Sequence, residues 1–251
     1  MRSRLHQGTC PDTLLSGPFN WTRSGIPGSI TRVFHPLIFS ILATLFLQAC
    51  GAAKLPPSTA RVVTDEIGRR VKVVSSPKRF ISLAPSATEM LFALGLGQEV
   101  VGVTAYCDYP PQATRIEKIG DTQRPSLEKI VALKPDLVVV STASQLEPFV
   151  QKLDEAAIPV YVSNPTNLGT LLDSIVKLGD VTGVPDRGRT LAAELRGRID
   201  AVKTKVRGLP RTRVLLVLGT EPLITVGGNT FINDLIETAG GESISADQKS
   251  D

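Results

Sequence analysis

Short aliphatic segments alternate with helical segments between residues 80 and 166, and this alternation constrains the fold more than any other feature of the chain. Residues 137–140 read LVVV, a continuous aliphatic run that is typical of a strand covered on both faces of a sheet. Strands that alternate with helices predict parallel βα units. The expected strands are 80–83, 100–103, 137–140 and 160–162. One helix is expected to begin at about residue 86, and two more are expected at 126–133 and 145–157.

Turn and cap signals support these assignments. Residues 62–64 and 71–74 have the pattern of a hairpin, and Gly68 between them can take a positive φ. Ser86 and Glu89 have the spacing of a capping box, in which a hydroxyl and a carboxylate satisfy N–H groups at a helix start. The cap explains this pair without a catalytic role.

A second group of elements follows a long helical stretch, which is expected from about 168 to 206 with a break at 183–185. Its elements are a strand at 214–218, a strand at 224–226, a turn with an N-cap at 227–230 and a helix at 230–239. These are too few to cover a sheet on both faces. We therefore expect a complete α/β lobe, a long helix and an incomplete second lobe whose strand 214–218 exposes one edge.

The first fifty residues have the features of an export signal. Residues 37–47 form an apolar run, which follows Arg23 and Arg32 and ends shortly before Cys50. The run is shorter than the ~20 residues that a transmembrane helix needs. Leu-Gln-Ala-Cys before Gly51 resembles the bacterial lipobox, whose cysteine is lipidated; a plain secretory signal with an incidental cysteine is the alternative. Residues 1–31 are attributed to an upstream start codon, and 51–60 to a tether.

Charge and metal-ligating residues exclude several function classes. The net charge is +4, but residues 51–251 hold 24 basic and 23 acidic side chains, so the excess lies in the leader and argues against nucleic acid. His6 and His35 both precede Cys50, so a chain that starts at Cys50 has no histidine for a metal site or a catalytic triad. No cysteine pair has metal-ligand spacing, and Cys107 is expected to be a small buried thiol.

Four motifs resemble those of one known family. They are RFISLAPSATEMLFALGLGQEVVGVTAYCDYPPQA at 79–113, SLEKIVALKPDLVVV at 126–140, VLLVLGTEPLITVGG at 214–228 and FINDLIETAGGES at 231–243. In this order they resemble the periplasmic cobalamin-binding and Fe(III)-siderophore-binding proteins of ABC importers. The resemblance covers about residue 61 to the last residue. It implies two parallel-sheet α/β lobes joined by a long rigid helix, a ligand held in the cleft between them, and no enzymatic activity.

The same resemblance suggests the ligand contacts. The pattern from Tyr106 to Pro111 is most similar to the cobalamin branch, in which the first tyrosine contacts the corrin, and Tyr109 is expected to pack into the core. Thr122 occupies a position that can hold a ligand-stacking tryptophan, and Arg124 would suit the anionic chelate of the alternative ligand, a ferric siderophore. The candidate contacts are Pro85, Ser86, Tyr106, Thr122 and Arg124.

The resemblance also implies partners and a location. Glu128, in the first turn of the expected helix 126–133, matches the glutamate that docks into an arginine pocket of the permease; a plain helix-dipole role is the alternative. The expected partners are the ABC permease with its ATPase, and the membrane through Cys50, at the periplasmic or outer side of the cell. The expected divisions are 1–50 signal and lipobox, 51–60 tether, 61–166 first lobe, 167–208 linking helical segment and 209–251 partial second lobe.

Overall fold

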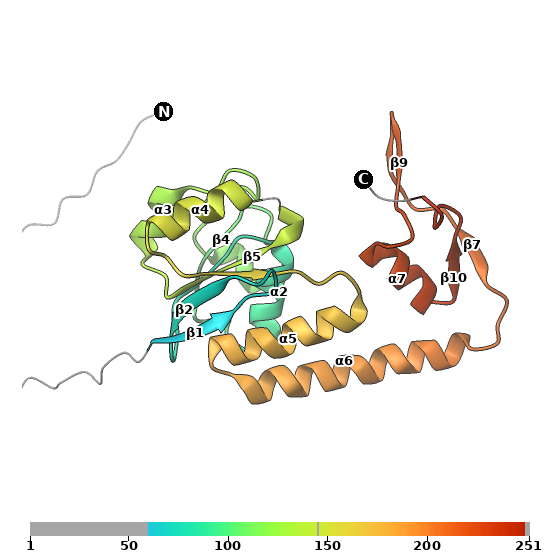
Figure 1. Ribbon diagram of the computed structural model, residues 1–251, viewed down its shortest axis with the longest axis horizontal. Coiled ribbons are helices and arrows are strands. Elements are labelled where there is room, and N and C mark those ends of the chain that lie inside the picture. The colour runs from blue at the N-terminus through green and yellow to red at the C-terminus, as the bar shows by residue number, and fades with distance from the viewer. Residues whose placement is uncertain (1–59, 145, 249–251) are drawn as a thin grey trace, which may run out of the picture. The chain divides into compact units, whose positions relative to one another are not determined.

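The computed structural model describes residues 60–144 and 146–248 (Figure 1). The described residues all belong to one compact unit, 55–251. Cys50 and the expected leader therefore lie outside the described residues. In the described part, no helix combines the length and the apolar character that crossing a membrane requires. Both hydrophobic clusters of the described residues lie in the unit 55–251, which thus has a core of its own.

Four parallel strands form the central sheet, in the order β4-β3-β5-β6. Their bounds are Phe80–Ser82 for β3, Val100–Val103 for β4, Leu137–Ser141 for β5 and Val160–Ser163 for β6. Each strand falls where the alternating pattern predicts it, and all pairings are parallel. Every residue of β3, β5 and β6 is buried, as expected for strands covered on both faces.

Helices cover both faces of this sheet (Figure 1). On one face, Phe80 and Leu137 pack in a cluster with residues of α2 (Pro85–Ala93) and α5 (Leu168–Thr182). On the other, the next residues along the same strands, Ile81 and Val138, pack with α3 (Leu127–Leu133) and α4 (Glu147–Glu155). The period-two alternation of the strands thus divides the core into two layers. Short 3-10 helices, η1 and η2, cover Pro111–Arg115 and Thr142–Ser144.

The start of α2 differs from the expectation. The predicted capping box of Ser86 and Glu89 is wrong: Ala84 is the N-cap residue, it has no side-chain cap, and Ser86 lies inside the helix. The carbonyl of Ala84 instead accepts hydrogen bonds from the buried hydroxyls of Ser82 at 2.9 Å and Thr88 at 3.2 Å. Pro85 has a fixed φ that suits the first helical position, so the helix starts one residue before the serine. Ser86 is consequently exposed and has no capping role.

The predicted N-terminal hairpin is confirmed, with β1 at Ala60–Thr64 and β2 at Arg70–Val74. Gly68 in its turn has a φ of 87°, a conformation that glycine adopts without strain. The turn lies against the last strand of the sheet, where the N–H of Glu66 donates to the carbonyl of Val162 at 3.1 Å. The hairpin turn therefore satisfies one backbone carbonyl of β6, which is an edge strand of the sheet.

The carboxylate of Glu66 joins three segments that are far apart in the sequence. It accepts hydrogen bonds from the hydroxyl of Ser174 in α5 at 2.6 Å, from the N–H of Asn164 at 2.7 Å and from the hydroxyl of Tyr161 in β6 at 3.1 Å. Burial, and then the charge of Glu66, raise the pKa of the Tyr161 hydroxyl above its usual range, so this group remains a donor. The hairpin is thereby fixed to both the sheet and α5.

The long helical stretch consists of two helices, α5 and α6 (Pro185–Val206), that pack on each other (Figure 1). The predicted break is confirmed: Gly183 ends α5 with a φ of 83°. A side chain on Gly179 would lie 2.9 Å from the Cα of Gly188. These two glycines let the helix backbones approach closely just after the turn.

The last segments form small sheets and a helix. They are β7 Thr212–Val214, β8 Val217–Thr220, β9 Leu223–Thr225, α7 Phe231–Thr238 and β10 Gly241–Ser243. The single strand predicted at 214–218 is wrong, because β7 pairs with β10 in parallel whereas β8 turns back onto β9. Both sheets have only two strands among the described residues, and side chains such as Leu218 and Leu223 remain exposed. The expected N-cap before α7 is confirmed: Thr230 accepts a hydrogen bond from the N–H of Asn233.

We predict that Glu66→Ala lowers the free energy of unfolding by about 2 kcal/mol or more, because it leaves partly buried donors without an acceptor. Glu89→Ala is the matched control: Glu89 is exposed, and its removal should change this free energy by no more than about 0.5 kcal/mol. Urea denaturation of residues 55–251 measures both values. Equal effects of the two substitutions would show that the Glu66 hydrogen bonds contribute nothing specific.

Candidate ligand-binding site

Three loops leave the carboxyl edge of the sheet next to one another. Ser82 and Val103, the last residues of β3 and β4, are register partners, so the loops after them begin side by side. The segment 117–120 runs along β4, where the N–H of Ile119 donates to the carbonyl of Val103 at 3.0 Å. The N–H of Ala105 donates to the carbonyl of Gly120 at 2.8 Å. The loops that follow Ser82, Val103 and Gly120 therefore emerge at the edge where parallel α/β sheets bind ligands.

The candidate contacts lie in two of these loops and, after the third, in the first turn of α2. We call them the edge group: Pro85 and Ser86 in α2, and Tyr106, Thr122 and Arg124 in the loops. Ser86 and Arg124 are exposed, Pro85 and Thr122 are half-buried, and Tyr106 has 62% of its surface exposed. Within the described residues, no recorded hydrogen bond joins two side chains of the edge group. The fold thus brings the five residues to one edge, where their side chains are accessible to a ligand.

Buried interactions hold the loop that presents Tyr106. The neighbouring Cys107 is 1% exposed, as predicted, and its Sγ lies 3.1 Å from the Oγ1 of Thr104. The ammonium group of Lys118 donates to the carbonyls of Cys107 at 2.9 Å and Ala113 at 3.1 Å. Because Cys107 points into the core, the adjacent Tyr106 is left in solvent. No sequence pattern indicates this role of Lys118, because its two acceptors are backbone carbonyl groups.

Tyr109 contradicts its prediction, because it is 63% exposed and does not pack into the core. It lines a shallow hollow together with Pro110 and with Phe92 of α2. The core position of this loop is taken by Cys107, whose short side chain fits below the loop. The two tyrosines are therefore equally exposed, but only Tyr106 belongs to the edge group.

The turn before α3 directs Arg124 outward. The carboxylate of Asp121 accepts hydrogen bonds from the backbone N–H groups of Gln123, at 2.8 Å, and Arg124. An aspartate that bonds the backbone two and three residues later is a common turn former, so Asp121 is a local sequence signal for this turn. This turn leaves the guanidinium of Arg124 without a recorded partner among the described residues.

Glu128 lies on the exposed surface of the first turn of α3. Ser126 caps this helix, since its hydroxyl accepts from the N–H of Lys129 at 3.3 Å. Lys129 itself pairs with Glu117 at 2.7 Å, whereas no ion pair of Glu128 is recorded in the described part of the chain. The Glu128 carboxylate is thus accessible to an external cation.

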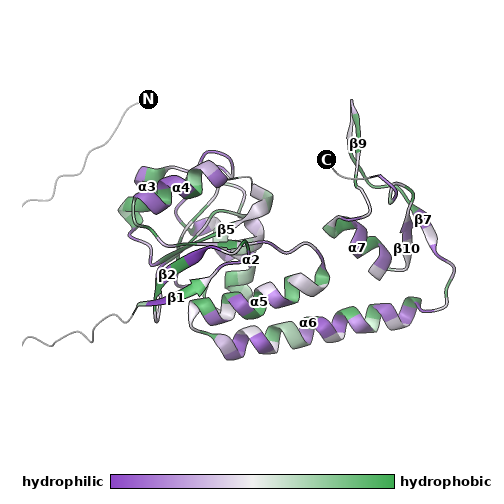
Figure 2. Cartoon of the chain, viewed as in Figure 1, coloured by the Kyte–Doolittle hydropathy of each residue, from purple (hydrophilic) through white to green (hydrophobic). Residues whose placement is uncertain are grey.

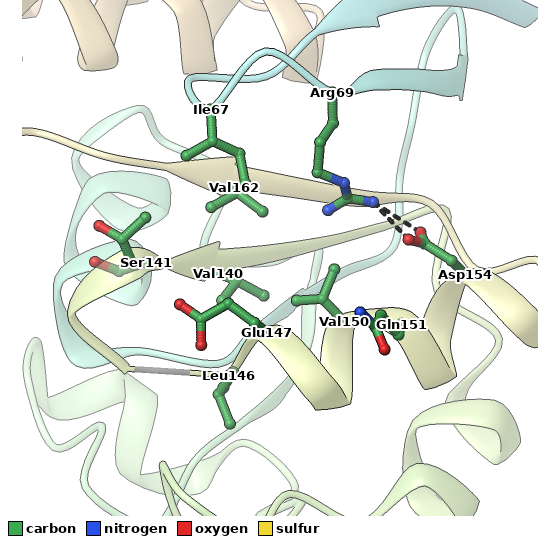
Figure 3. Close-up of a pocket in the computed structure, with 11 residues that line it drawn as sticks. Ile67, Arg69, Val140, Ser141, Leu146, Glu147, Val150, Gln151, Asp154 and Val162 are labelled. Atoms are coloured by element: carbon green, nitrogen blue, oxygen red, sulfur yellow. Dashed lines mark hydrogen bonds and ion pairs between the residues drawn. The ribbon is translucent and has the colours of Figure 1, made fainter.

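A separate cavity of about 180 Å³ lies between the hairpin turn and α4 (Figure 3). Val140, Val150 and Val162 line it, and Arg69 at its rim pairs with Asp154 at 2.7 Å. Sites for drug-sized ligands usually have volumes of roughly 300–1,000 Å³, so this cavity is too small for a chelate of that size. Among the described residues, no three Asp, Glu, Cys or His side chains are grouped closely enough to hold a metal ion.

Comparison with known proteins identifies the family. A family described as "Periplasmic binding protein" matches residues 81–251. The chain belongs to this family. In agreement with the expected fold class, the unit is α/β with a parallel sheet.

Several members are similar in sequence and in structure. The vitamin B12-binding protein of Yersinia pestis is 33% identical over 172 residues, which are 68% of this chain and 61% of that protein. The periplasmic vitamin B12-binding protein of Vibrio cholerae is 33% identical with a TM-score of 0.63, over 69% of this chain and 68% of the other. A periplasmic heme-binding protein of Roseiflexus is 32% identical with a TM-score of 0.59, over 65% and 64% of the two chains. The chain spans about 61% of the length of the curated relatives that it matches.

Proposed function

We propose that this protein is the substrate-binding component of an ABC importer, and that it captures cobalamin and delivers it to a membrane permease. The observation that carries the proposal is the exposed Tyr106 at the carboxyl edge of the sheet, in a chain that is similar to two proteins named for binding vitamin B12. Membership of a family of periplasmic binding proteins supports a location outside the cytoplasm. It also supports a role in binding solutes over a role in catalysis.

The chemistry of the edge group suits a broad, partly polar ligand. A tyrosine ring offers a flat apolar face and a hydroxyl group, and a corrin offers a large ring face with amide side chains around it. Ser86 and Thr122 add hydroxyl groups that donate to or accept from amides. The edge group would form one wall of the binding cleft.

We expect Tyr106→Ala to weaken cobalamin binding about tenfold or more, because buried aromatic anchors dominate many interfaces. Tyr109→Ala is the control, since Tyr109 has the same exposure in the same loop but lies outside the edge group. Absorbance titration or equilibrium dialysis with cyanocobalamin gives both dissociation constants. An equal loss in the two variants would contradict the proposed ligand site.

A ferric siderophore is the second candidate ligand, and the exposed guanidinium of Arg124 favours it. An anionic chelate would pair with this cation, whereas the corrin contact depends on Tyr106. The same titration with a ferric siderophore separates the two ligands. Tight siderophore binding that Arg124→Gln abolishes, without cobalamin binding, would support the second candidate.

Glu128 is proposed to dock on a cationic pocket of the permease. We predict that Glu128→Arg leaves ligand affinity within about twofold but impairs uptake in cells, because charge pairs at an interface rim orient the partners and speed their association. Glu147→Arg is the matched control: Glu147 is also an exposed first-turn glutamate, at the start of α4, and loses the same helix-dipole interaction. Equal loss of uptake in both variants would favour the dipole explanation for Glu128.

Cys50 is proposed to be the lipidated N-terminus of the mature protein. We predict that Cys50→Ala prevents acylation, so that metabolic labelling with a fatty acid no longer marks the protein. Cys10→Ala is the control, because Cys10 lies far upstream of the apolar run. Continued labelling of Cys50→Ala, or loss of labelling in Cys10→Ala, would contradict the assignment.

A further inference from the structure

The positive charge of the folded unit is concentrated in one short segment. Residues 196–213, here called the basic segment, hold seven Lys and Arg side chains and one acidic residue, Asp200. The rest of residues 51–251 holds 17 basic and 22 acidic side chains, so it is net negative. The net charge of residues 51–251 is therefore close to zero although the positive and negative charges lie in different parts of the chain. The seven cations are Arg196, Arg198, Lys203, Lys205, Arg207, Arg211 and Arg213.

None of these seven cations is neutralised within the described part of the chain. All seven residues are exposed, and no ion pair or hydrogen bond of their side chains is recorded. Arg189, about two turns before Arg196 in the same helix, differs, because it pairs with Asp186 at 2.8 Å and lies 3.8 Å from Asp180.

Carboxylates also lie near the segment, namely Glu194 in α6 and Asp234 and Glu237 in the hollow lined by Lys203, Arg207 and Arg211. Among the described residues, none of the three forms a recorded ion pair with the seven cations.

Helix geometry places four of the cations around one outward face of α6. The helix packs on α5 and the core through partly buried residues such as Leu195 and Ile199. The outward face of α6 is the one that points away from α5 and the core. At 100° per residue, Arg196 and Lys203 lie on one flank of this outward face, and Arg198 and Lys205 lie on its other flank. Figure 2 shows α6 as a largely hydrophilic helix beside the more apolar α5.

The middle of the outward face carries small side chains, and two exposed carboxylates, Glu194 and Asp200, lie between it and the two flanks. Ala193, Gly197 and Ala201 occupy the middle, and all three are exposed. A side chain built on Gly197 would meet no atom within 4 Å. Because the middle has no bulky side chain, cations on both flanks can reach the same flat surface. Because the face carries no large apolar side chain, it suits adsorption on a surface and not insertion into one.

Stabilisation of the helix dipole does not account for the whole segment. That interaction acts within the last turn of a helix, where only Lys203 and Lys205 lie. Arg196 and Arg198 lie further up the helix, and the remaining three arginines follow its end. Most of the segment is therefore left with unbalanced positive charge, which an external anionic surface would offset.

We propose that the basic segment is a contact surface for anionic phospholipid headgroups, by which the folded unit adsorbs on the outer face of the membrane. The proposal adds to the proposed anchor at Cys50 and depends on it only for location. A tether of residues 51–60 spans at most roughly 36 Å when extended, so the unit would stay close to the bilayer. Each Lys or Arg near an anionic bilayer contributes favourably, and the attraction ends within about a Debye length.

The test measures vesicle binding of residues 55–251, which contain the whole described core but not Cys50. Sedimentation with phosphatidylcholine vesicles that contain about a third phosphatidylglycerol should capture the protein at low salt, and pure phosphatidylcholine should not. Binding should be lost at ~0.5 M salt, where the Debye length is only a few ångströms. The variant R196Q/R198Q/K203Q/K205Q should bind at least about tenfold more weakly.

The matched control is R70Q/K72Q/K152Q/K177Q, which removes the same charge from four exposed cations outside the basic segment. It should retain binding within about twofold, and circular dichroism checks that both variants are folded. Equal losses in the two variants, or displacement by inorganic phosphate at constant ionic strength, would overturn the proposal. Absence of vesicle binding, with capture by an acidic protein that depends on the same four cations, would assign the surface to a protein partner. Cobalamin titration of the same samples tests the proposed function separately.

Discussion

A parallel sheet must be covered on both faces, and this requirement determines the first lobe of the protein. The strands β3, β5 and β6 are buried throughout, with alternate residues packed into two separate hydrophobic layers. Helices have to return the chain to the same end of the sheet before each new strand. As a result, the loops after β3 and β4 open at one edge, and the edge group lies there.

One charged group connects this lobe to the segments around it. The carboxylate of Glu66 receives hydrogen bonds from β6, from the residue after β6 and from α5. The guanidinium of Arg61, in the same hairpin, donates to the carbonyls of Asp180 and Val181 near the end of α5. The hairpin therefore holds α5 against the sheet, and α5 in turn supports the glycine-lined contact with α6. A partly buried charge is stable here because several donors surround it.

The candidate site combines a rigid scaffold with exposed side chains. Cys107 and Lys118 fix the loop from its buried side, while Tyr106 faces solvent from the same loop. The proposed docking residue Glu128 and the basic segment lie on other elements, α3 and α6 with its following linker. Ligand contact, permease docking and contact with lipid would thus use different surfaces of one unit, and substitutions can test them independently.

The sequence by itself determined the elements of the first lobe and the break between α5 and α6. Aliphatic runs, the 3.6-residue period and glycines at helix ends are local signals, and local geometry decides them. It also placed Tyr106 in the loop after its strand and Glu128 in the first turn of its helix. Only the tertiary structure decided that Tyr109 stays out of the core, that Ser86 is exposed, and that the expected strand at 214–218 divides. Those outcomes, like the hydrogen-bond partners of Glu66, depend on contacts between residues that are distant in the chain. A local sequence pattern does not predict such contacts.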